Sequence, residues 1–110
     1  MGARLVLQAR DHVREVLHED DAAADAWHAV PRSTGSREWD ALLAALVEHE
    51  FVATDREPPR WTEVDPGDER PQVDFVLPSL LLGVDEIRAT TPTWLAAHGV
   101  FAAERDLTTA

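Results

Sequence analysis

A row of histidines and carboxylates near the N-terminus has the residue types that could bind a metal. His18, Asp21, Asp25 and His28 are spaced at i, i+3, i+7 and i+10, which would place them along one face of a continuous helix. Imidazole and carboxylate ligands of this kind suit Zn²⁺, Mn²⁺ or Fe²⁺. Glu15 and Asp25 also stand three residues before a histidine, which is the spacing of carboxylate-bridged metal bundles.

Chance and geometry both weaken this metal hypothesis. With 5 His and 21 acids in 110 residues, 5 × 21/110 predicts about one acid-x-x-His pair by chance, and two occur. The row would also span about 15 Å of helix, which is too long for one mononuclear site. We interpret it as a solvated helix face and expect no metal or other cofactor. A small metal-dependent enzyme or metal-sensing regulator that uses the face from His18 to His28 is the alternative.

Nucleophilic catalysis finds little support in the sequence. The chain has no Cys, Lys or Tyr, which removes thiolate, Schiff-base and P-loop lysine chemistry. Ser36 and Ser79 stand where helix caps are expected, and no nucleophile elbow is present. We therefore predict that the protein is not an enzyme.

The charge balance restricts the partners. Ten Arg against 21 acids give a net charge of −11, and the two halves carry similar shares (−6 over 1–55 and −5 over 56–110). Phosphate backbones and anionic lipid surfaces would repel such a chain, so we expect neither nucleic acid nor membrane as a partner of this chain alone, but a more basic protein. No run of 18 apolar residues occurs, and the expected location is the cytoplasm.

Hydrophobic periodicity predicts a mainly helical protein. Residues 37–52 have helical apolar spacing, with Ser36 as N-cap and Glu38 in the first turn. The N-terminal residues also fit a helix, although residues 5–7 could form a short strand before a helix capped by Asp11. A third helix is expected from about residue 20 to 29. Trp27, Trp39 and Trp94 have the spacing of core residues.

The C-terminal third is expected to be helical as well. One helix would be capped by Ser79 and place Leu80, Leu81, Val84 and Ile87 on one side. A second would have Thr91 at its N-cap, Pro92 at its first position and Gly99 after its end. Residues 102–108 are expected to add a last helical turn or two. The predicted fold is a small single-domain helical bundle of four or five helices over residues 1–110.

A proline-rich loop over residues 54–78 interrupts this pattern. It contains five prolines, and a loop of this length in a compact domain is typical of a functional or partner-ordered segment. Trp61 and Phe75 give it two large apolar groups, and acidic residues surround Trp61. We predict that much of the partner-binding surface consists of these residues: Trp61, Phe75, Glu57, Glu63, Asp65, Asp68 and Glu69.

Several short motifs resemble a known family. In order along the chain they are Pro59-Arg60-Trp61, Phe75-Val76-Leu77-Pro78-Ser79-Leu80, Thr91-Pro92, Leu95, His98-Gly99-Val100-Phe101 and Asp106-Leu107. Together they resemble the C-terminal region of small actinobacterial helix-turn-helix regulators of antitoxin type. The helix at 39–47 and the residues Gly2 to Leu7 resemble the flanking segments of that region. The sequence shows no helix-turn-helix before these motifs, so we do not expect the DNA binding of that family to carry over.

The resemblance implies the toxin-binding half of such a regulator. We therefore expect a non-enzymatic, antitoxin-like module of a toxin-antitoxin system, which neutralises a basic, co-encoded toxin by covering its surface. A structural homodimer, paired through its tryptophan-rich surface, is a further alternative.

Overall fold

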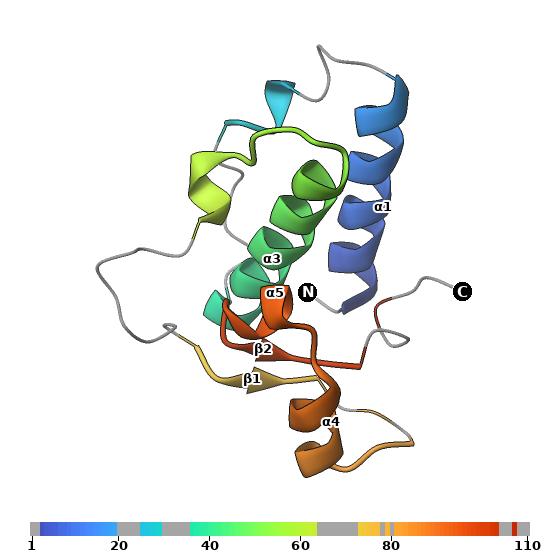
Figure 1. The fold of residues 1–110 in the computed structure, drawn as a ribbon, viewed down its shortest axis with the longest axis vertical. Helices are drawn as coiled ribbons and strands as arrows, with labels where there is room; N and C mark the ends of the chain where they lie inside the picture. Colours follow the sequence, from blue (N-terminus) through green and yellow to red (C-terminus); the bar gives the residue numbers. More distant parts are fainter. Residues whose placement is uncertain are drawn as a thin grey trace.

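A computed structural model describes residues 3–19, 25–29, 36–63, 73–77, 79, 81–103 and 107 (Figure 1). These residues are mainly helical, with one small parallel sheet. The elements in chain order are α1 (Ala3–Glu19), α3 (Arg37–Ala53), the 3-10 helix η1 (Arg60–Thr62), β1 (Phe75–Val76), α4 (Val84–Thr90), α5 (Thr93–Ala96) and β2 (Val100–Phe101). No helix among them is long and apolar enough to cross a bilayer.

Helix α1 confirms the helical reading of the N-terminus, and the alternative strand at residues 5–7 is wrong. The helix begins well before Asp11, which therefore does not cap it. Its buried face holds Val6, Leu7, Val13, Val16 and Leu17. This face packs on α3 and forms the largest helix interface of the protein.

Helix α3 confirms the element predicted over 37–52. Ser36 is its N-cap in the extended region (φ −135°, ψ 127°), and its hydroxyl accepts a hydrogen bond from the backbone N–H of Trp39 at 3.4 Å. The side of α3 opposite its apolar stripe is only half exposed at Asp40, Ala44 and Glu48, because η1 and α5 also pack on this helix. Helix α3 is thus the central element of the core.

Helices α1 and α3 run side by side in the same direction (Figure 1). Two polar contacts agree with this direction. Arg14 of α1 pairs with Glu50 of α3. Arg56, which follows the end of α3, donates to the carbonyl of Leu17 near the end of α1. An up-and-down bundle would instead place consecutive helices antiparallel. The long stretch between Glu19 and Ser36 is what allows the parallel arrangement.

A two-stranded parallel sheet corrects the expectation of helices alone. Phe75 is paired with Val100 and Val76 with Phe101, and the backbone N–H of Phe75 donates to the carbonyl of Gly99 at 2.8 Å. Gly99 adopts φ 78°, a left-handed conformation that favours glycine, and this turns the chain from α5 into β2. Of the helical turn expected over 102–108, Ala102 and Ala103 directly follow β2 and are not helical, whereas Leu107 has 3-10 helical conformation.

The helix that Ser79 was predicted to cap begins four residues later than expected. Its N-cap is Gly83, and the hydroxyl of Ser79 instead accepts a hydrogen bond from the backbone N–H of Leu81 at 3.2 Å, outside the helix. Only Ile87 of the expected apolar side is buried, whereas Leu81 is 74% and Val84 55% exposed. Leu80 lies outside the described residues.

The short helix before Gly99 is present with a shifted start. Pro92 is the N-cap of α5, and Thr91 is the C-cap of α4. The Thr91 hydroxyl donates to the carbonyl of Ile87 at 2.6 Å and accepts from the backbone N–H of Ala102 at 3.1 Å. Thr91 therefore joins α4 to the chain after β2 and caps no N-terminus.

Of the third predicted helix, only residues 25–29 are described. Asp25 and Ala26 are helical, as predicted, and a turn follows in which the His28 backbone N–H donates to the Asp25 carbonyl at 3.0 Å. Trp27, Trp39 and Trp94 all pack against the core as predicted, but each remains half-buried at its edge. The rest of that predicted helix, residues 20–24, lies outside the described residues.

Candidate partner-binding surface

The first ten residues of the predicted loop, residues 54–63, have a defined structure and are called the anchored loop below. They begin as a tight turn at the end of α3. The Thr54 hydroxyl donates to the carbonyls of Glu50 and Phe51 at 3.1 and 3.0 Å. Asp55 takes φ 60°, a left-handed conformation that aspartate tolerates better than most residues, and the next backbone N–H, of Arg56, returns to the Phe51 carbonyl at 2.9 Å.

Side chains fasten the rest of the anchored loop to the core. The Arg56 guanidinium donates to the Leu17 carbonyl at the end of α1 at 3.2 Å. Pro59 and Thr62 are fully buried, and the Thr62 hydroxyl donates to the Pro59 carbonyl at 2.6 Å. These contacts join the loop to both α1 and the core, so the backbone that carries its exposed side chains is fastened at several points.

Trp61 is a structural residue as well as a candidate contact. Its indole Nε1–H donates to the backbone carbonyl of Trp27 at 2.8 Å, and its ring packs against the core. The side chain is still half-exposed, so part of the ring can reach a partner. The sequence did not predict the bond to Trp27, because the two residues are 34 positions apart.

The acidic residues of the prediction divide into two groups. Glu57 and Glu63 are exposed on the anchored loop together with Asp55, whereas Arg60 is the exposed cation among them. Asp65, Asp68 and Glu69 lie outside the described residues.

Phe75 belongs to a different part of the surface from Trp61. It lies in β1 and meets Trp39 edge-on, with ring centroids 5.2 Å apart and planes at 77°. Among the residues that the structure describes, no ring contact joins Phe75 to Trp61. Trp61 and Phe75 are therefore two separate apolar positions, the first on η1 and the second on β1.

The row of candidate metal ligands does not lie on one helix. Helix α1 ends at Glu19, just after the exposed His18, whereas Asp25 is helical beyond that end and His28 lies in the turn that follows Ala26. The His28 ring instead meets Phe51 edge-on at 5.5 Å. Asp21 lies outside the described residues, and within the described ranges no group of three or more His, Asp or Glu side chains could hold a metal ion.

A histidine and carboxylate pair between α3 and α5 was missed by the sequence analysis. The buried His98 places its Nε2 3.1 Å from Oε1 of Glu48. Beside this pair, His49 stacks on Trp94 with centroids 4.0 Å apart. The sequence held two signals for this pair: Glu48 and His49 are adjacent, and Trp94 and His98 have i, i+4 spacing. In this geometry the pair holds α5 on the central helix.

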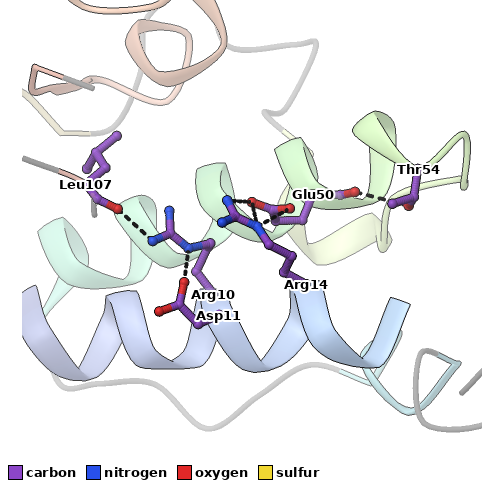
Figure 2. Close-up of polar contacts among 6 residues, drawn as sticks. All are labelled: Arg10, Asp11, Arg14, Glu50, Thr54 and Leu107. Carbon is purple, nitrogen blue, oxygen red and sulfur yellow. Dashed lines mark hydrogen bonds and ion pairs between the residues drawn. The ribbon is translucent and has the colours of Figure 1, made fainter. Parts of the chain in front are cut away.

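An ion pair joins α1 to α3 in the core (Figure 2). Glu50 is buried, and its carboxylate accepts from Nη2 of Arg14 at 2.6 Å and from Nε at 3.1 and 3.2 Å. This hydrogen bonding to Glu50 raises the pKa of Arg14 above its ordinary value. The Arg14 side chain is 52% exposed, so its charge stays partly hydrated.

A second arginine, Arg10, ties the C-terminal segment to α1 (Figure 2). Its Nη2 donates to the carbonyl of Leu107 at 2.6 Å, and its Nε contacts Oδ1 of Asp11 at 2.7 Å. Arg10 is buried, as is Leu107. Arg10 and Arg14 of α1 thus both serve the fold.

Comparison of the chain with family models, with curated proteins and with solved structures found no significant match.

Proposed function

We propose that this protein is a non-enzymatic protein-binding domain that neutralises a more basic partner by covering part of its surface, in the manner of an antitoxin. The observation that supports this proposal best is the anchored loop. It presents the half-exposed Trp61 beside exposed carboxylates, on a backbone fastened by buried contacts.

The rigidity of the anchored loop favours binding. A partner that docks on preformed structure does not have to order the loop, so less of the interaction free energy is lost on association. Tryptophan is also among the residues that most often contribute large shares of interface energy.

The charge of the chain favours a basic partner. At a net charge of −11, long-range attraction would speed the encounter with a basic protein and disfavour acidic ones. The co-encoded toxin of a toxin-antitoxin pair, often a nucleotidyltransferase-like or ribonuclease-like enzyme, is the partner that the family resemblance implies.

The test is a binding titration with the purified product of the adjacent reading frame at two salt concentrations. Glu57→Gln with Glu63→Gln should slow association and flatten its salt dependence. Glu15→Gln with Glu19→Gln is the matched control, because it removes two equally exposed glutamates from α1. We expect the same effect as in the loop pair when Asp65, Asp68 and Glu69 are neutralised together. No binding by the native chain, or equal effects of the two pairs, would contradict the proposal.

A further inference from the structure

A second surface stands out at the start of α4. Among the described residues, three large apolar side chains are more than half exposed: Val52 at 58%, Leu81 at 74% and Val84 at 55%. Single exposed apolar residues such as Val52 are ordinary on protein surfaces. Leu81 and Val84, however, are three positions apart, so their Cα atoms lie within about 11 Å of one another. Leu82 between them is half-buried.

The fold holds these side chains outward. A helix of seven residues has no stability of its own, and α4 depends on tertiary contacts. Ile87 is buried beneath it, and the hydroxyl of Thr91 ties its last turn to the chain after β2. Ile87 thus takes the inner side of α4, while Leu81, before the helix, and Val84, its first residue, stay exposed.

The charges next to this apolar cluster are negative. Asp85 and Glu86 follow Val84 and are exposed, and within the described part of the chain neither forms an ion pair. Arg88, the basic residue of α4, is occupied elsewhere. It pairs with Asp74 at 3.0 Å and lies over the ring of Phe101 at 4.5 Å.

We propose that Leu81, Leu82, Val84, Asp85 and Glu86, called the α4 head below, form a second docking surface. Its occupant is a partner segment that carries apolar side chains next to arginine or lysine residues. Charge complementarity selects this occupant. A second copy of the chain would bring its own net charge of −11, and its own Asp85 and Glu86, toward the same acids.

The α4 head is separate from the anchored loop. It lies at the lower end of the molecule, whereas α3 ends and the anchored loop begins in the upper part (Figure 1). The inference therefore stands whether or not the anchored loop binds a toxin.

The probe is a labelled amphipathic helical peptide of about 15 residues, made of leucine and lysine, titrated against the whole chain. A scrambled peptide of the same composition controls for charge alone. We expect the amphipathic peptide to bind more tightly and to shift the NMR signals of Leu81, Leu82 and Val84. Leu81→Ser with Val84→Ser should weaken its binding about tenfold or more, since most of both side chains is available for burial.

The matched control is Val52→Ser, because Val52 is as exposed as Val84 but lies in the last turns of α3. It should leave peptide binding unchanged, whereas Asp85→Asn with Glu86→Gln should weaken binding and reduce its salt dependence. Equal binding of the scrambled peptide, or signal shifts outside the α4 head, would overturn the proposal. So would sedimentation of the native chain as a dimer that Leu81→Ser with Val84→Ser dissociates, because a second copy would then cover this surface.

Discussion

Trp61 is the residue at which fold and proposed function meet, and two substitutions separate them. Trp61→Phe keeps an aromatic ring but removes the Nε1–H that donates to the Trp27 carbonyl at 2.8 Å. Loss of one such hydrogen bond costs about 1 kcal/mol in the free energy of unfolding. For a domain of this size that corresponds to a Tm lower by roughly 4 °C.

Trp61→Ala should cost the free domain more. Truncation of a fully buried tryptophan costs about 3–5 kcal/mol, and Trp61 is half-buried, so about half of that applies. With the lost hydrogen bond the total is about 3 kcal/mol. This is a large share of a typical domain stability of about 5–15 kcal/mol, although the fold should survive.

The assay is thermal and urea unfolding followed by circular dichroism, with Trp94→Phe as the matched control. Trp94 is also half-buried, but its ring stacks on His49 and its indole N–H has no hydrogen bond in the described structure. Trp61→Phe should therefore be the less stable of the two variants. Equal stabilities would refute the assigned role of the bond to Trp27.

Binding to the adjacent gene product then measures the contribution of Trp61 to partner binding. Trp61→Ala should weaken that binding by roughly 2 kcal/mol, or about 30-fold, under conditions in which the variant is folded. Trp61→Phe should weaken it much less, because most of the ring surface remains. Undiminished binding by folded Trp61→Ala would mean that Trp61 serves the core alone.

Three further predictions concern the core, a helix cap and the metal hypothesis. Arg14→Met should destabilise the protein by about 2 kcal/mol, which is less than for a fully buried pair because Arg14 is half-exposed. Adding Glu50→Met should restore most of this loss of stability, and a double variant as unstable as Arg14→Met alone would contradict the prediction. The Glu38 carboxylate accepts a hydrogen bond from its own backbone N–H and another from the Ser36 hydroxyl, and these bonds lower its pKa. Its contribution to stability should therefore be full above the ordinary pKa of glutamate and disappear as the pH falls through the lowered pKa. Glu38→Gln should therefore lower Tm at neutral pH and leave it unchanged in acid, and a loss of equal size at both pH values would count against this linkage. Elemental analysis should find no stoichiometric Zn, Mn or Fe, and His18→Ala with His28→Ala should leave Tm nearly unchanged; one metal per chain that this variant loses would favour a metal-dependent function.

The two long helices could be predicted because their signals are local. The Ser36 cap, the acidic first turn and the apolar spacing of 37–52 all act within a few residues, and α3 begins and ends within one residue of the prediction. The fit of the N-terminal residues to a helical stripe was likewise sufficient for α1.

The sheet could not be predicted in the same way. Strands of two residues show no alternation, and β1 and β2 exist only because Phe75 and Val100 meet across the fold. The start of α4 depended on tertiary contacts as well. Leu81 and Val84 fit a helical apolar side in sequence, but of these three residues only Ile87 is buried in the folded chain.

The composition of the surface and its arrangement also have different origins. The sequence alone determined that the chain is acidic, that it lacks Cys, Lys and Tyr, and that its proline-rich segment cannot form a long helix. Only the tertiary structure decided that the Trp61 indole bonds to Trp27 and that Glu50 lies buried against Arg14. Each of these contacts joins residues more than 30 positions apart, and hydrogen-bond partners at that separation are chosen by the packing of whole helices, which no local pattern encodes.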